Sequence, residues 1–223
     1  MGLDMRPMGK PKLGFENRFE QIMRIIEGKE KQEISFFEKV KGKKVKTNDE
    51  LLEEWFSNQI QAYETIKAPQ VGRDKEADEW IKHKYEALEE KPPLNEFLTE
   101  YQGYYVIELA KDKDGVPVYI SLGQDENVFR GKFLEDCVDL IGEDLVSEAW
   151  ETKLGAETLD YGNRLMKIAN KIANEKNLEY LKDQRIPPDT DETSIESKLH
   201  IVFSLAKWLI FYGENGHGYE ADF

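Results

Sequence analysis

The segment from Tyr104 to Leu122 constrains the fold most, because strict alternation of apolar and polar residues is found there and nowhere else in the chain. Such a two-residue period is typical of a strand with one buried face. Asp114-Gly115 lies between the two alternating runs and supplies the positive-φ position that a tight turn needs. We therefore predict an antiparallel hairpin over residues 104–122. Two strands alone are marginally stable in water, so the hairpin must pack against helices.

Most of the remaining sequence has a helical period. A capping box at Thr47 and Glu50 predicts one helix start, and a second at Thr193 and Glu196 opens a final helix that ends near Tyr212. This final helix is apolar around most of its circumference, which predicts a central position. The predicted fold class is α+β and predominantly α, with amphipathic helices packed around a small antiparallel sheet.

Residues 1–14 predict an extended basic arm, because glycine, proline and methionine interrupt any helical pattern there. The arm either docks through Leu3, Met5 and Met8 or stays mobile. Residues 15–223 are predicted to form a single, mostly helical domain, with a possible seam at 92–103.

The composition is that of a folded protein, with 39% hydrophobic and 34% charged residues. Cys137 is the only cysteine, so no intrachain disulfide can form, as in a reducing compartment. Its apolar sequence neighbours predict a buried, unreactive thiol. Neither a signal peptide nor an apolar run long enough to span a membrane is recognised, and we expect a cytoplasmic protein.

The formal net charge is −14, and it is concentrated in the second half of the chain. Residues 123–223 contain 21 Asp and Glu against 11 Lys and Arg, whereas residues 1–122 contain 24 against 20. This charge repels nucleic acid and anionic membranes, so neither is expected as a partner. It favours either solubility alone or a basic protein partner.

Two histidines suggest a possible chemical site. Glu196 and His200 are four residues apart on one helical face, and His217 lies between two glycines in the tail. These three residues are the catalytic candidates. The alternative is a surface pair and a loose tail. No cofactor motif is recognised, so no cofactor is predicted. The candidate metal ligands are His217, Glu214, Glu220 and Asp222.

A run of lysines before the first capping box is the one candidate anion site. It lacks the glycine spacing of a phosphate-binding loop, and a solvated loop is the alternative. The candidate residues are Lys41, Lys43, Lys44 and Lys46.

The leading hypothesis is a cytosolic binding protein whose acidic C-terminal half meets a basic protein partner. The alternative is a small-molecule or metal-dependent enzyme with its site beside the last helix, at Glu196, His200 and His217. The sequence leaves open which of the two is correct.

Overall fold

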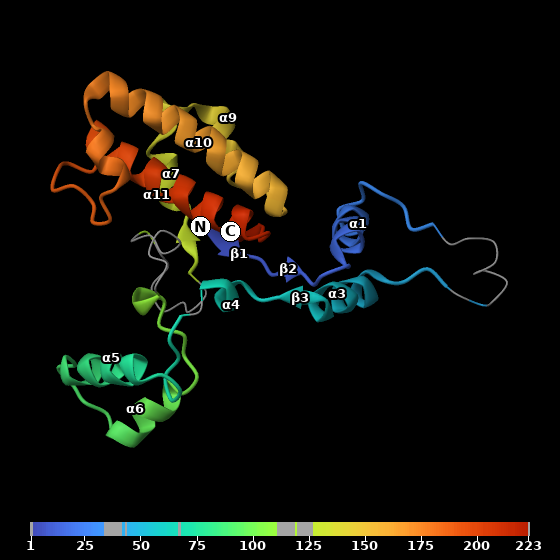
Figure 1. Cartoon of the computed structure of the whole chain (residues 1–223), viewed down its shortest axis with the longest axis horizontal. Helices are drawn as coiled ribbons and strands as arrows, with labels where there is room; N and C mark the ends of the chain where they lie inside the picture. The colour runs from blue at the N-terminus through green and yellow to red at the C-terminus, as the bar shows by residue number, and fades with distance from the viewer. Residues whose placement is uncertain are drawn as a thin grey trace. The chain divides into compact units, whose positions relative to one another are not determined.

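A computed structural model describes residues 2–33, 42, 44–66, 68–110, 119 and 127–222. They form two compact units (Figure 1). The large unit consists of Met1–Met8 and Ala62–Phe223, and the small unit of Gly9–Gln61. The architecture is α+β and predominantly α with small antiparallel sheets, which confirms the predicted fold class.

The large unit is built on two long helices that lie side by side, α10 (Gly155–Lys176) and α11 (Ile195–Glu214) (Figure 1). Glycines permit their close approach. A Cβ atom added at Gly213 would lie 2.6 Å from the backbone nitrogen of Leu159, and one at Gly162 would lie 2.8 Å from Cβ of Leu209. Because real Cβ atoms essentially never come so close, larger residues at these two positions would force the helices apart.

Helix α11 is the most buried element of the large unit, as its apolar circumference predicted. Thirteen of its residues are buried, including the side chains of Trp208 and Tyr212. Its ends differ from the prediction. Ser194 rather than Thr193 caps the N-terminus, by accepting a hydrogen bond from the backbone nitrogen of Ser197 (3.1 Å). At the other end, the helix continues two residues beyond Tyr212, to Glu214.

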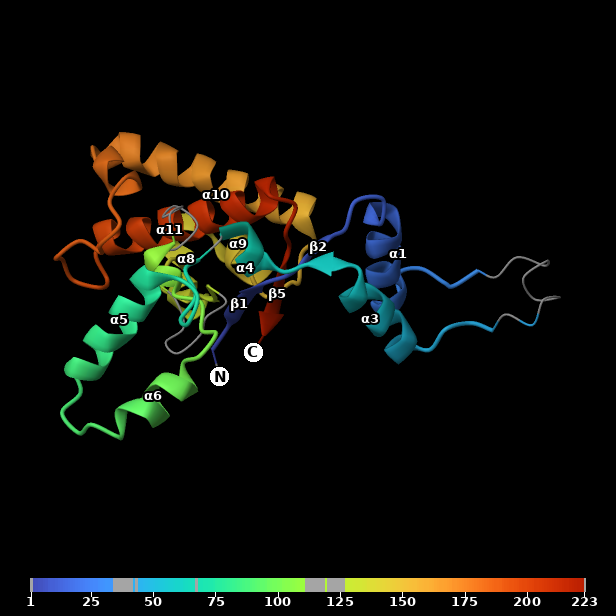
Figure 2. The same ribbon diagram turned by 60° about the horizontal axis from the view of Figure 1, so that its bottom comes forward.

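The N-terminal segment is the central strand of a three-stranded antiparallel sheet. Strand β1 (Asp4–Pro7) lies between β4 (Phe129–Arg130) and β5 (Tyr219–Asp222), in the order β4-β1-β5. Figure 2 shows β1 and β5 side by side. Of the two alternatives for the arm, the docked one is observed. The three apolar side chains that were expected to dock are all buried, namely Leu3, Met5 and Met8.

The predicted first strand of the hairpin is not formed over its full length. Tyr105 makes one isolated antiparallel bridge with Gln70, and the chain then enters a 3-10 turn at Ile107–Leu109. Val106 and Ile107 are both buried although they are adjacent in sequence, which a strand with one buried face would not allow. Residues 111–118 and 120–126, which hold the rest of the predicted hairpin, lie outside the described part of the chain.

Shorter elements complete the large unit. Around Val71, Ala77, Ile81 and Phe97, two helices form a small second core with half-buried aromatic side chains at its edge. The remaining elements are α4 (Ala62–Ile66), α5 (Lys75–Glu86), α6 (Leu94–Glu100), α7 (Lys132–Glu135), α8 (Val138–Ile141), α9 (Glu143–Glu148) and the 3-10 turn η3 (Glu179–Lys182).

Over its described residues, the small unit contains two helices and a two-stranded sheet. Its elements are β2 (Lys10–Pro11), α1 (Glu16–Ile26), α3 (Asn48–Ser57) and β3 (Gln59–Ile60). The predicted capping box of Thr47 and Glu50 is present at the start of α3. Phe19 of α1 stacks on Trp55 of α3 with ring centroids 4.6 Å apart. Among the described helices of both units, none is long and apolar enough to cross a membrane.

The central position of β1 makes a testable prediction. Met5 is 0% exposed, so Met5→Ala should lower the free energy of unfolding of the large unit by about 2–5 kcal/mol. As a matched control, Ile186→Ala removes a side chain that is 73% exposed and should change it by less than about 0.5 kcal/mol. Labelling of the buried Cys137 thiol during urea unfolding reports on the large unit alone, because the chain has no other cysteine. Equal stability losses in the two variants would contradict the observed docking of the arm.

Candidate functional site

His200 is a buried residue of α11 whose two ring nitrogens both have protein partners. Nε2 lies 3.0 Å from the backbone oxygen of Gln184, which can only accept, so Nε2 carries the proton. Nδ1 then accepts a hydrogen bond from the hydroxyl of Tyr119, at 2.8 Å. The imidazole thus links Gln184 and Tyr119 to α11. Coordination of a metal or transfer of a proton would first require one of these bonds to break.

The surroundings of His200 disfavour its protonated form. Burial lowers the pKa of His200 below its ordinary value of about 6.5, and the positive charge of Lys207 lowers it further, while the bond to Gln184 opposes the shift. Lys207 itself donates to the backbone oxygen of Lys182, at 2.8 Å. His200 thus stays neutral at physiological pH.

His217 is also completely buried, and it joins two other parts of the large unit. Nδ1 donates to the backbone oxygen of Met8 (2.8 Å), which leaves Nε2 to accept from the hydroxyl of Thr65 (2.6 Å). Met8 is the last residue of the large unit before the small unit begins, and Thr65 follows shortly after the chain returns. His217 therefore fastens both chain segments at the point where the small unit is inserted.

The structure does not bring the histidine candidates into one site. The ring nitrogens of His200 and His217 bond to different residues, and among the described residues no hydrogen bond or ion pair links Glu196 to either histidine. Asp222 forms an ion pair with Arg6 (3.6 Å), and Glu214 and Glu220 are exposed. Within the described residues, no group of three or more His, Cys, Asp and Glu side chains could hold a metal ion.

The lysine candidates are only partly described. Lys41 and Lys43 lie outside the described residues, and Lys44 is exposed. Lys46 pairs with Glu54 at 3.0 Å. Its charge is thus partly neutralised by a carboxylate of the same unit.

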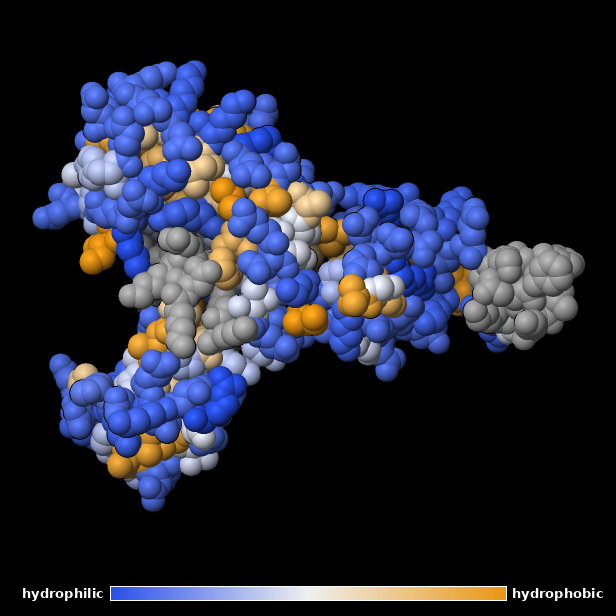
Figure 3. Space-filling model, in the orientation of Figure 1, coloured by the Kyte–Doolittle hydropathy of each residue, from blue (hydrophilic) through white to orange (hydrophobic). Residues whose placement is uncertain are grey.

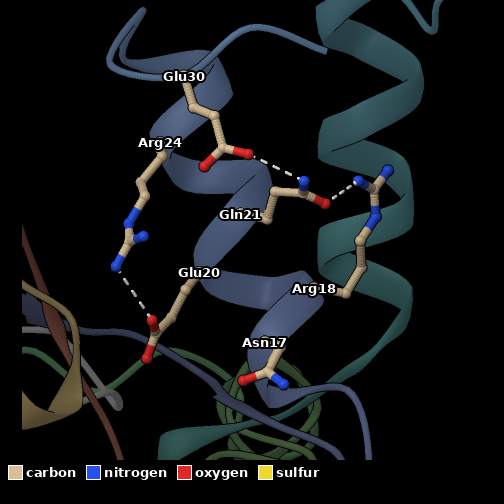
Figure 4. A pocket seen from close by; sticks show the side chains of 6 residues that line it. All are labelled: Asn17, Arg18, Glu20, Gln21, Arg24 and Glu30. Atoms are coloured by element: carbon tan, nitrogen blue, oxygen red, sulfur yellow. Dashed lines mark hydrogen bonds and ion pairs between the residues drawn. The ribbon is translucent and has the colours of Figure 1, made fainter. Parts of the chain in front are cut away.

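A shallow groove of about 440 Å³ lies along α1 of the small unit (Figure 4). Most of the side chains that line it are hydrogen-bonded to one another. Arg18 donates to Gln21 (2.7 Å) and Gln21 donates to Glu30 (2.9 Å), while the guanidinium of Arg18 also binds Glu54 through two hydrogen bonds. The bonds from Arg18, with help from Lys46, hold the pKa of Glu54 at about 2. The network fastens α1 to α3 and leaves little unsatisfied polarity for a ligand.

Cys137 is buried, as predicted. Burial raises the pKa of the Cys137 thiol to about 12, and the nearby charge of Asp136 acts in the same direction. The thiolate is the reactive form, so a thiol in this environment is a poor nucleophile. Its Sγ lies 3.5 Å from the backbone oxygen of Lys198, where it packs α8 against α11.

Sequence reasoning missed a surface that the fold assembles around the first turns of α11. Exposed carboxylates approach it from two segments that are distant in sequence. Lys198 binds Asp139 of α8 (3.0 Å), and His200 binds Gln184 of the loop that precedes α11. We call this surface the acidic end, and it consists of Glu135, Asp136, Asp139, Asp183, Asp189, Asp191 and Glu192.

Apart from Asp139, these carboxylates form no ion pair with a described residue. Asp191 instead accepts hydrogen bonds from the hydroxyl and the backbone nitrogen of Thr193, which lower the pKa of Asp191. The overall excess of acids was visible in the sequence, but the contact of both segments with the first turns of α11 was not. Comparison with known proteins adds nothing to this picture, since no family model, curated protein or solved structure matches the chain.

The buried state of His200 predicts a specific pH dependence. The pKa of His200 is lowered on folding, so the unfolded chain binds the extra proton, and stability must fall as the pH drops below about 6.5. We expect the loss in free energy of unfolding between pH 7 and pH 5 to be smaller in His200→Gln than in the wild type, as measured by urea unfolding with near-UV circular dichroism. His83→Gln changes an exposed histidine and should retain the wild-type dependence. Identical pH dependence in all three proteins would contradict the assignment.

Proposed function

We propose that this chain is a protein-binding module whose acidic end meets a basic protein partner. The observation that carries the proposal is a group of exposed carboxylates beside the first turns of α11, most of which form no ion pair with a described residue. An exposed ion pair contributes only about 0–1 kcal/mol to the free energy of unfolding. Exposed carboxylates without an ion pair therefore do little for the stability of the fold. They are, however, effective in steering and selecting a partner of opposite charge.

The local charge balance supports this choice of partner. Between Asp183 and Glu196 the chain carries five acids and one basic residue, Arg185. The same negative potential repels nucleic acid and anionic lipid. A cytoplasmic setting, expected from the single cysteine, remains part of the proposal. No observation favours the enzymatic alternative, because its two histidines are occupied by structural bonds.

The proposal is tested by neutralising the acidic end without changing its shape. The full chain is immobilised and exposed to a lysate of the cells that produce it, and retained proteins are identified at about 50 and about 300 mM NaCl. We expect a basic protein that is retained at low salt and released at high salt. Retention should fall at least about tenfold when four unpaired carboxylates lose their charge. The variant carries Glu135→Gln, Asp136→Asn, Asp189→Asn and Glu192→Gln.

A control variant removes the same amount of charge from another surface of the large unit. It carries Glu89→Gln, Glu90→Gln, Glu96→Gln and Glu100→Gln, all at exposed positions on or near α6. Retention should be close to that of the wild type. Equal loss in both variants would show that only net charge matters, and salt-independent retention would refute an electrostatic interface.

A further inference from the structure

An exposed apolar side chain lies within the acidic end. Ile186 is 73% exposed, in a loop (residues 183–194) that connects η3 to α11. Figure 3 shows a hydrophobic protrusion next to hydrophilic atoms where Figure 1 places this connection. A large apolar residue held in water has no role in the stability of the fold. Scattered exposed residues are common, so the case for Ile186 depends on its setting.

The first feature of that setting is that the loop is held in place by hydrogen bonds near Ile186. The side chain of Gln184 donates to the backbone oxygen of Ile186 (2.7 Å), and the backbone oxygen of Gln184 accepts from buried His200 (3.0 Å). Directly before the loop, the backbone oxygen of Lys182 accepts a hydrogen bond from the side-chain nitrogen of Lys207 (2.8 Å). The chain on the N-terminal side of Ile186 is thus tied to α11 at two points.

The other side of the loop is restrained as well. Pro187 and Pro188 follow Ile186 directly and fix their own φ angles. Further on, the hydroxyl of Thr190 lies 3.0 Å from that of Ser197, and the backbone nitrogen of Ser194 donates to Asp191 (2.9 Å). A loop that is restrained before binding loses less conformational entropy on binding, which favours affinity.

The second feature is the charge around the apolar side chain. Asp183 precedes Ile186 by three residues, and Asp189, Asp191 and Glu192 follow it within six. An apolar contact with a charged rim is the usual composition of a protein interface, in which the central contact supplies affinity and the rim supplies selectivity. A negative rim is complementary to a positive one.

We infer that Ile186 is the apolar anchor of the acidic end and inserts into a recess on the basic partner. His200 acts as a positioning residue, because it fixes Gln184, which in turn holds Ile186. This inference depends on the proposed function, since it takes the partner to be a basic protein, and it adds the point of contact.

The inference is tested by placing a photo-crosslinking amino acid at position 186 of the full chain, in the cells that produce it. A matched control carries the same group at position 94. Leu94 is 43% exposed, adjoins two prolines and has acidic neighbours, but it belongs to α6, far from the loop in sequence. We expect position 186 to form an adduct with a basic protein at least about tenfold more efficiently than position 94. Wild-type chain in excess should suppress the adduct, and Ile186→Ala chain should suppress it less.

The outcomes separate this inference from the proposed function. If the basic protein is retained in the lysate experiment but crosslinks equally from both positions, the acidic end binds it without Ile186 as anchor, and the inference is wrong. An adduct between two copies of the chain would also overturn it. If the lysate experiment retains no basic protein that is released by salt, the proposed function is wrong, and the inference that depends on it is wrong as well. His200→Gln should weaken the adduct at position 186 without affecting position 94.

Discussion

The burial of α11 is the constraint on which the rest of the large unit depends. A helix that is apolar around most of its circumference must be covered on every side, and one neighbouring helix cannot do this. Helix α10 covers one side through the close contacts at Gly162 and Gly213. Other parts of the chain contact α11 elsewhere, since Asn127 accepts from the indole of Trp208 and donates to the hydroxyl of Tyr212, and Gln184 binds His200. Several segments of the chain are therefore needed to cover the apolar surface of α11.

The same requirement explains why the two ends of the chain are joined. Strand β1 pairs with β5, and His217, which follows α11, binds Met8. The small unit is inserted between residues that His217 holds together, and its own strands β2 and β3 pair with each other. Each unit thus has its own local network of contacts. Both histidines are buried and hydrogen-bonded within the large unit, and the acidic end lies on the surface of the same unit.

Sequence patterns with a helical period predicted the observed elements, whereas the two-residue period of residues 104–110 gave one isolated bridge and a 3-10 turn instead of a full strand. The last helix and its central position follow from its apolar residues, and the start of α3 follows from Thr47 and Glu50. The strands that form the three-stranded sheet could not be located from the sequence. Strand β1 has only four residues, and its partner strands lie more than 120 residues away in the chain. The hydrogen-bond partners of the two histidines could not be predicted for the same reason. The spacing of Glu196 and His200 suggested a pair, but the residues that bind His200 and His217 come from distant segments. Long-range contacts leave no periodic signal.

The central claim is that α11 and β1 form one cooperative core with the acidic end attached to it. Native-state hydrogen exchange, resolved by residue, tests this most directly. The amides of residues 199–212 and those of Met5 and Arg6 should exchange slowest in the large unit and with the same free energy of opening, because all are released only when this core unfolds. If the amides of α11 opened at a lower free energy than those of α10, or independently of β1, the claim of one cooperative core would be wrong.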